Sequence, residues 1–284
     1  MTFGAVESSR FLGQPIDLYE FRFGAETESV ARYTNIEAGF TYAGEDYTPL
    51  PIARGNLVSS GTLDRTTLQM TLPETSDIAR LYDQETPSSV ITVVVRQGHV
   101  PDGDFKVVFS GRVLNGAFDE QHQIVLDCEP ISSSMRRAGL TRDYQYACPH
   151  VLYGPQCRAS REAATRSVTA LSVNGPRVTF SPTWDTDARR PKYLGGIAEW
   201  TGSDGRLARR SIVSVEAGGV VVLSSDADTL TSGASVSMVL GCNHQHGMTD
   251  PDGDCLNLHD NIVNYGGQHE IPLKNPIGIT NNFY

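Results

Sequence analysis

At 284 residues the chain is long enough to bury a full hydrophobic core, and two domains are the expected number. A hydrophobic share of 39% with 20% charged residues is ordinary for a soluble globular protein. The formal net charge of −10 argues against non-specific binding to nucleic acid, which depends on neutralising phosphates with Lys and Arg.

Short strands dominate the first half of the chain. Residues 16–23 predict a strand in which Tyr19, Phe21 and Phe23 lie on one face and Glu20 and Arg22 on the other, and residues 40–47 predict a hairpin that turns at 43–46. A short helix is expected at 76–82. Further strands are predicted at 68–72, 90–96, 106–118 and 121–128, the last two joined by a turn at 119–120. Many short strands with almost no helix indicate a mainly β protein, a barrel or a sandwich.

A second set of strands follows in the second half. The turn Asn174-Gly175-Pro176 is a hairpin signal, and glycine-rich turns lie at 202–205 and 217–219. Strands are predicted at 167–173, 177–180, 196–201, 211–216, 220–223 and 235–240. The expected domains are a first β domain at 1–147, an inserted β module at 165–240, and a cysteine region formed by 148–164 and 241–284.

Four of the five cysteines form two pairs that flank the inserted module. Cys148 and Cys157 precede it, Cys242 and Cys255 follow it, and both pairs lie in loop-like sequence rich in Gly, Pro and His. A chain that leaves its main body, builds a module and returns needs something to tie the two crossings together. Four thiolates that hold a metal centre would do this. Cys128 ends a predicted strand and is expected to be a buried small hydrophobic residue.

Targeting and membrane segments are not expected. Residues 1–7 lack the basic stretch and apolar run of a secretory signal, and the apolar runs at 91–95 and 220–223 are too short to cross a bilayer. We therefore expect the protein to fold in the cytoplasm. Reducing conditions there disfavour disulfides and favour metal binding by the same thiols.

Several stretches together carry a family resemblance. They are Cys-x8-Cys with Tyr153-Gly154 before its second cysteine, Tyr-Leu-Gly-Gly-Ile-Ala-Glu-Trp at 193–200, Gly241-Cys242 running on to Cys255, Asn-Ile-Val-Asn-Tyr-Gly-Gly at 261–267, and the segments 40–42 and 47–52. Over nearly its whole length the chain resembles the tail-tip hub, or minor tail, proteins of long flexible-tailed phages and gene transfer agents. That group includes the minor tail protein L of phage lambda.

The resemblance implies a fold, a cofactor and a role. The fold would be a tail-tube-like β-barrel hub, with a small β-barrel as the inserted module, and a [4Fe–4S] cluster would be held by Cys148, Cys157, Cys242 and Cys255. The protein would be a non-enzymatic baseplate hub in the virion, joining the tail tube to the tail tip. It would form a homo-oligomeric ring, commonly a trimer, around the DNA conduit. Expected partners are the distal tail protein, the central tip or fibre protein and other tail proteins, with genomic DNA passing through the lumen without specific binding.

Other interpretations of the four cysteines stay open. Zinc is one, although its sites usually show tight C-x₂₋₄-C knuckles that this chain lacks, and structural thiols or a disulfide are another. His244 and His246 could replace a thiolate, but a role in a polar loop or behind the ligands is expected instead. Asp250, Asp252 and Asp254 resemble a calcium loop without the Gly and the closing Glu at EF-hand spacing.

The alternative functions are a cysteine-dependent enzyme and a zinc-stabilised binding module. The sequence contains no G-x-S-x-G elbow, Walker A loop or H-E-x-x-H helix. Asp143 and His150 lie near Cys148, which makes a cysteine peptidase formally possible, and a redox enzyme could use the cluster.

Two expectations concern assembly. The tail at 257–284, rich in Asn, Gly and Pro, looks extended, and we expect it to pack on a neighbouring subunit or on the next tip protein. The acidic balance of the chain also predicts an excess of Asp and Glu on the wall of a DNA conduit, with simple solubility as the competing explanation.

Overall fold

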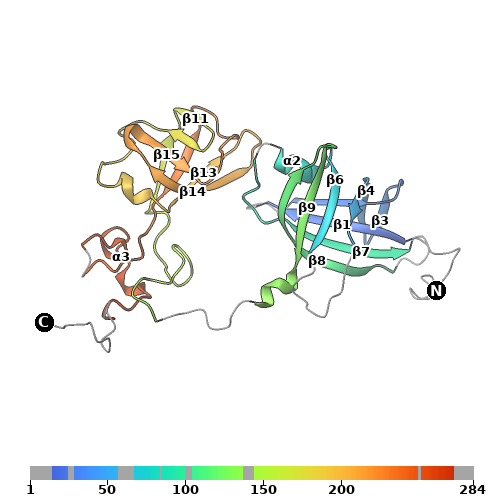
Figure 1. Cartoon of the computed structure of the whole chain (residues 1–284), viewed down its shortest axis with the longest axis horizontal. Helices are drawn as coiled ribbons and strands as arrows, with labels where there is room; N and C mark the ends of the chain where they lie inside the picture. Colours follow the sequence, from blue (N-terminus) through green and yellow to red (C-terminus); the bar gives the residue numbers. More distant parts are fainter. Residues whose placement is uncertain are drawn as a thin grey trace. The chain divides into compact units, whose positions relative to one another are not determined.

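The computed structural model describes residues 15–24, 29–56, 67–83, 85–99, 104–136, 144–248 and 251–271. The chain divides into two compact units, Met1–Ala138 and Gly139–Tyr284, and strands make up most of the regular structure of each (Figure 1). The mainly β class predicted from the sequence is therefore confirmed. Within the described ranges, no helix is long and apolar enough to cross a membrane.

One sheet forms the first unit. Its strands are β1 (Pro15–Phe23), β2 (Ser29–Thr34), β3 (Phe40–Tyr42), β4 (Glu45–Pro49), β5 (Ala53–Arg54), β6 (Leu68–Pro73), β7 (Thr92–His99), β8 (Lys106–Phe118) and β9 (Gln123–Pro130). They pair in the order β3-β4-β2-β1-β7-β8-β9-β6-β5. Only β2 and β4 pair in parallel; the other neighbours are antiparallel. Among the described residues the order does not return to its first strand, so closure into a barrel stays a prediction.

The core of the first unit combines buried side chains of its strands with those of one short helix. Leu68, Met70 and Leu72 of β6 are buried, as their alternation predicts. Helix α2 (Asp77–Tyr82) packs on this core through Ile78. It begins where Ser76 accepts a hydrogen bond from the backbone N–H of Ala79 over 3.1 Å, which satisfies one of the free donors of the first turn. A 3-10 helix, η1 (Ile131–Arg136), follows β9.

Strand β1 is buried on both faces, and its charged residues are paired. Glu20 contacts Arg22 over 2.7 Å and Arg96 over 3.1 Å. Burial by itself raises the pKa of Glu20, but the hydrogen bonds from the two guanidinium groups outweigh it and hold the pKa below its usual value. Asp17 pairs with Arg54 over 2.6 Å. These pairs allow a central strand to carry charge inside the fold.

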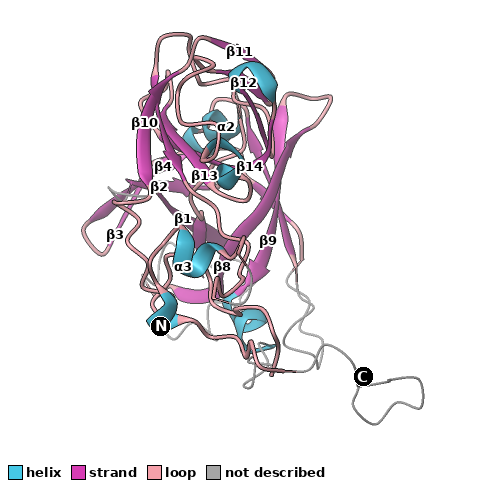
Figure 2. Ribbon diagram, turned by 90° about the vertical axis from the view of Figure 1, so that its left-hand side faces the viewer, coloured by secondary structure: helices cyan, strands magenta, loops and turns pink. Residues whose placement is uncertain are grey.

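A second sheet forms most of the second unit. Its strands are β10 (Thr165–Thr169), β11 (Ser172–Asn174), β12 (Arg177–Thr179), β13 (Ile197–Thr201), β14 (Leu207–Val215), β15 (Val220–Leu223) and β16 (Ser235–Val239). They pair in the order β10-β16-β13-β14-β15-β12-β11, and the helices between them are few and short (Figure 2). Its core includes Phe180, Tyr193, Trp200 and Met238.

The strand predicted at 167–173 is two strands in the structure. Strand β10 pairs with β16, whereas β11 pairs with β12 in the predicted hairpin. The chain changes partner between them, where the N–H of Ala170 bonds to Ala234 and the N–H of Leu171 bonds to Thr179. Because β10 and β16 are neighbours, the chain enters and leaves this sheet at the same place.

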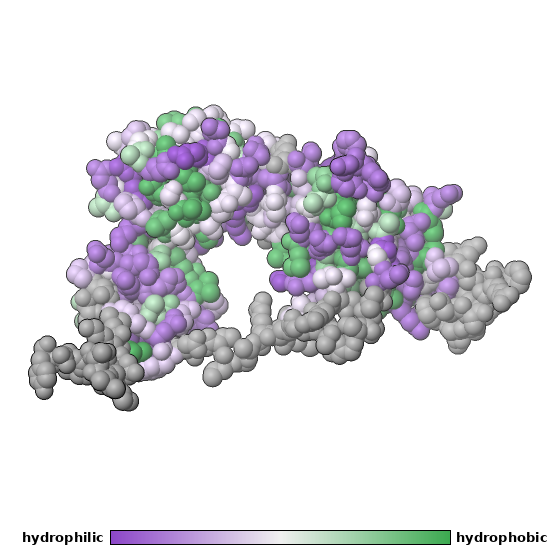
Figure 3. All heavy atoms as spheres, in the orientation of Figure 1, coloured by the Kyte–Doolittle hydropathy of each residue, from purple (hydrophilic) through white to green (hydrophobic). Residues whose placement is uncertain are grey.

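The surfaces of both units expose polar and apolar side chains. On the face drawn in Figure 3, apolar side chains lie between larger polar areas on both units. Exposed apolar residues occur in the first unit, such as Val90 and Leu114, and in the second, such as Val151 and Val263.

Candidate metal centre

The four paired cysteines of the sequence line one cavity in the second unit. They are Cys148, Cys157, Cys242 and Cys255, and the lining is completed by His150, Leu152, Ala159, His244, His259, Asn261 and Asn264. All four are free thiols. Cys128 lies apart, fully buried in the core of the first unit, where burial raises the pKa of its thiol to about 12. Its expected role as a small hydrophobic residue is confirmed.

The sheet explains why cysteines so far apart in sequence meet. Thr165, eight residues after Cys157, pairs with Val239, three residues before Cys242. The antiparallel register of β10 and β16 therefore brings the two loops to the same end of the sheet. Tyr153 adds a contact, since its hydroxyl donates to the carbonyl of Leu240 over 2.7 Å.

Backbone contacts join the first cysteine to the loop of the third. The N–H of Cys148 donates to the carbonyl of His244 over 2.9 Å. In return, Nδ1 of His244 lies 3.0 Å from the carbonyl oxygen of Cys148, so the tautomer with a proton on Nδ1 donates to it. His244, which also lines the cavity, thus links the backbone of Cys148 to the loop of Cys242.

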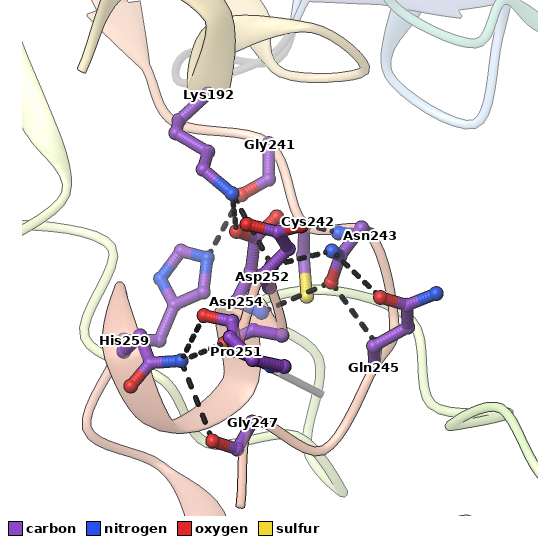
Figure 4. A network of polar contacts seen from close by, with 12 residues as sticks. Lys192, Gly241, Cys242, Asn243, Gln245, Gly247, Pro251, Asp252, Asp254 and His259 are labelled. Carbon is purple, nitrogen blue, oxygen red and sulfur yellow. Dashed lines mark hydrogen bonds and ion pairs between the residues drawn. The ribbon is translucent and has the colours of Figure 1, made fainter. Parts of the chain in front are cut away.

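The long spacer between Cys242 and Cys255 closes on itself. Asn243, just after the first cysteine, donates its N–H to Asp254 over 2.8 Å. Asp254, just before the second, donates its N–H to the side chain of Asn243 over 3.0 Å (Figure 4). The pair of bonds brings the two ends of the twelve-residue spacer into direct contact.

Glycine makes the closed loop possible. A Cβ atom on Gly253 would lie 2.2 Å from the backbone nitrogen of Gly247, so only glycine fits at this approach. Gly247 itself has a φ of 99°, which side chains rarely adopt. The amide of Asn257 donates to carbonyl oxygens of this loop, at Pro251 and Gly253, over 3.0 Å each.

Asn261 connects the two cysteine pairs. Its side-chain amide donates to the carbonyl oxygen of Cys157 over 2.6 Å and lies 3.5 Å from the Sγ of the same residue. Its backbone N–H donates to the carbonyl of Cys255 over 2.8 Å. Its own carbonyl lies 3.4 Å from the Sγ of Cys255. A single buried residue therefore contacts one cysteine of each pair.

N–H groups are directed at three of the sulfurs. Gly266 donates its N–H to Cys148 over 3.4 Å, His244 donates its N–H to Cys242 over 3.3 Å, and the amide of Asn261 faces Cys157. Such donors stabilise negative charge on sulfur and tune clusters held by thiolates. This donor set, four thiols with N–H groups directed at three of them, fits a thiolate-bound metal centre.

The thiols also influence one another. Burial raises the pKa of Cys242 to about 11, with the N–H of His244 opposing the change and the neighbouring Asp254, Cys157 and Cys148 adding to it. Burial, followed by the other three thiols, raises the pKa of Cys255 to about 12. A bound cation would offset this repulsion and would release the protons of the thiols.

The part of the chain that the structure describes contains no ready-made site for a single metal ion. No group of three or more His, Cys, Asp or Glu side chains there has the arrangement needed to hold one metal ion. The thiols border the cavity without converging on one point.

The other sequence candidates have structural partners. His150 places Nδ1 at 3.1 Å from the carbonyl of Asn264, and the buried His246 stacks on His269 at 3.9 Å between ring centroids. Asp254, the last residue of the acidic run that resembles a calcium loop, pairs with Lys192 over 2.6 Å. Asp143 and Asp250 lie outside the described residues.

The sequence reasoning was wrong about part of the tail. Residues 257–271 were expected to be extended and to need a neighbouring subunit, but they fold against their own unit. The hydroxyl of Tyr265 donates to Tyr146 over 2.6 Å, and the N–H of Gln268 donates to Gln145 over 2.8 Å. Two short helices, α3 (Asp254–Asn257) and η4 (Ile262–Asn264), shape this segment. Residues 272–284 lie outside the described ranges.

Three residues that organise the site were not identified as such from the sequence. Asn261 belongs to the motif at 261–267, and its closeness in sequence to Cys255 was the signal that could have identified it. Asn243 and Lys192 gave no signal, because their roles depend on contacts across 11 and 62 residues.

Comparisons with known proteins give one informative result. No family model and no curated protein matches the chain. Its fold is similar to that of a chain in the solved structure described as the virion of a native gene transfer agent particle. The TM-score is 0.67 at 13% sequence identity, and the likeness covers 99% of this chain and 97% of the other. At this identity the likeness shows a common fold along the full length of both chains.

Proposed function

We propose that the protein is a structural component of a phage-like or gene-transfer-agent virion. The observation that carries this proposal is the fold likeness to a chain of such a particle, which extends over 99% of this chain and so includes both units. A likeness confined to one sheet would carry far less, because common β folds serve many functions. The role is structural rather than enzymatic.

Within the virion we place the protein at the tail tip, as a hub of the minor-tail type related to protein L of phage lambda. Copies form a ring, with three as the expected number, and the first unit closes into a tail-tube-like barrel in that setting. The end strands β3 and β5 offer backbone groups to neighbouring strands, which is how open sheets commonly associate. The ring surrounds the DNA conduit and contacts the distal tail protein and the central tip or fibre protein.

The cavity of the second unit is the proposed metal centre. Cys148, Cys157, Cys242 and Cys255 would hold a [4Fe–4S] cluster, and the N–H groups of Gly266, His244 and Asn261 would support the thiolates. Its contribution is to stabilise the joined loops, because metal-binding energy adds directly to folding energy. Zinc is the competing occupant.

The decisive experiment for the metal is chemical analysis of protein purified without air. A cluster gives a broad visible absorption, with about four iron and four sulfide per chain as its composition requires. Stoichiometric zinc without iron or sulfide would overturn the iron assignment. Cys128→Ala is the matched control, because it removes a thiol that lies outside the cavity.

A second experiment tests the virion role. Particles assembled without this protein should lack a complete tail tip when viewed by electron microscopy. The purified protein should show no enzymatic turnover that is lost when one reactive cysteine is alkylated. Complete, infectious particles without the protein would contradict the structural role. A single reactive cysteine whose alkylation abolishes hydrolysis would favour the peptidase alternative.

A further inference from the structure

One residue of the strand module contacts both ends of the second cysteine pair. Lys192 lies in the 3-10 helix η2 (Arg190–Tyr193), and its carbonyl accepts the N–H of Gly241 over 2.9 Å. Its ammonium group donates to Asp254 over 2.6 Å and to the carbonyl of Asp252 over 3.3 Å. Gly241 immediately precedes Cys242, and Asp254 immediately precedes Cys255. Lys192 therefore contacts the residue before each cysteine of the pair (Figure 4).

Lys192 is itself held in place by the core. The next residue, Tyr193, is fully buried, and its hydroxyl donates to Asp185 over 2.8 Å. Asp185 in turn pairs with Arg166 of β10 over 3.0 Å. The backbone of Lys192 is thus held by the strand module, although Lys192 precedes Cys242 by 50 residues and Cys255 by 63.

Asp254 uses both carboxylate oxygens. One accepts from Lys192 and the other accepts from the N–H of Asn243, which follows Cys242. The residue is 4% exposed, so loss of either partner leaves a buried polar group unsatisfied. An asparagine in its place would offer one acceptor oxygen only. Its NH₂ group would face one of the two donors, Lys192 or the N–H of Asn243.

We propose that Lys192 and Asp254 form a positioning pair that sets the separation of Cys242 and Cys255, so that folding of the strand module prepares this half of the metal centre. The inference rests on the proposed metal centre, because the separation of the two thiols matters for function only if they bind a metal. The pairing itself is testable without metal. Residues that orient ligands from behind are worth about 10-fold to 100-fold in metal affinity.

The test compares Asp254→Asn with Asp252→Asn in the full-length protein. The control lies two residues away, is exposed, and enters the network through its backbone carbonyl, which the substitution keeps. Iron and zinc retained against EDTA are measured for each protein. In metal-free samples, a short bifunctional thiol alkylator is applied, and the yield of the Cys242–Cys255 cross-link is mapped by mass spectrometry.

Asp254→Asn should lower metal retention about 10-fold and lower the cross-link yield, while Asp252→Asn behaves as the wild type. Far-UV circular dichroism and the fluorescence of the two core tryptophans, Trp184 and Trp200, should stay unchanged, which separates positioning from unfolding of the module. Equal retention and equal cross-linking in the two variants would overturn the inference.

A second variant covers the case in which Asp254→Asn does not fold. Lys192→Met removes the ammonium group, keeps the aliphatic stem, and leaves the bonds between Asn243 and Asp254 in place. It should lower the same cross-link yield, and a wild-type yield would refute the pairing. If the wild-type protein binds neither iron nor zinc, the proposed metal centre fails, and the cross-link comparison still decides the role of the pair.

Discussion

The side-chain amide of Asn261 lies 2.6 Å from the carbonyl oxygen of Cys157, across 104 residues of chain. The same residue bonds the backbone of Cys255 over 2.8 Å, and its side-chain oxygen accepts from Asn264 over 2.7 Å. The first and last cysteine loops are therefore joined by hydrogen bonds in addition to any bond through a metal.

The first prediction concerns this junction. Asn261→Leu keeps the volume of the side chain but leaves the buried carbonyl of Cys157 without its donor, so the free energy of unfolding should fall by about 1–3 kcal/mol. Chemical denaturation of the purified protein measures the change. Asn115→Leu, on an exposed position of β8, is the control and should differ little from the wild type. Equal stability of the two variants would show that the junction contributes little.

The second prediction concerns the thiols. Cys242→Ser should reduce bound metal and lower the stability of the second unit together, because a weaker ligand removes binding energy that contributes to folding. Metal analysis and thermal unfolding of the same sample test the link. Cys128→Ala should lower stability through a small core cavity yet keep the metal. Loss of metal in both variants would argue against a localised site.

The third prediction concerns acid stability. Since the folded-state pKa of Glu20 is lowered, its ion pairs stabilise the fold above the ordinary value of 4.5, and this contribution is lost as the pH falls through the folded-state pKa. Glu20→Gln should therefore have a lower free energy of unfolding than the wild type at pH 7. The difference between the two proteins should become smaller below pH 4.5. Urea unfolding at several pH values measures it, with the exposed Glu37→Gln as the control. A gap that stays constant with pH would contradict the assignment.

The fourth prediction separates two parts of the tail. Deletion of residues 272–284 should leave metal content and thermal stability unchanged, because the described contacts to the cysteine loops come from residues up to His269. Deletion of 261–284 should abolish metal binding, since it removes Asn261 and Gly266. If the proposed assembly role is right, the shorter deletion still yields folded protein that fails to join particles. Normal particles from that deletion would refute a role of 272–284 in assembly.

Local patterns predicted much of the fold. The alternation of Leu68, Met70 and Leu72 marks β6, and the turn residues after Phe118 mark the hairpin of β8 and β9. Strands β2 and β5 were missed. Strand β5 has two residues, too few to show an alternation of polar and apolar side chains. Its Arg54 is held by Asp17 of β1, a contact that no local pattern can reveal.

The sequence by itself determined the mainly β class, the inserted strands and the identity of the four thiols, because side-chain alternation, turn residues and cysteine spacing are local properties. Tertiary structure decided that these thiols share one cavity. That outcome depends on β10 pairing with β16, on Asp254 meeting Asn243, and on Lys192 reaching Asp254. Each of these contacts joins residues that are distant in sequence, and its energy exists only after the chain has folded.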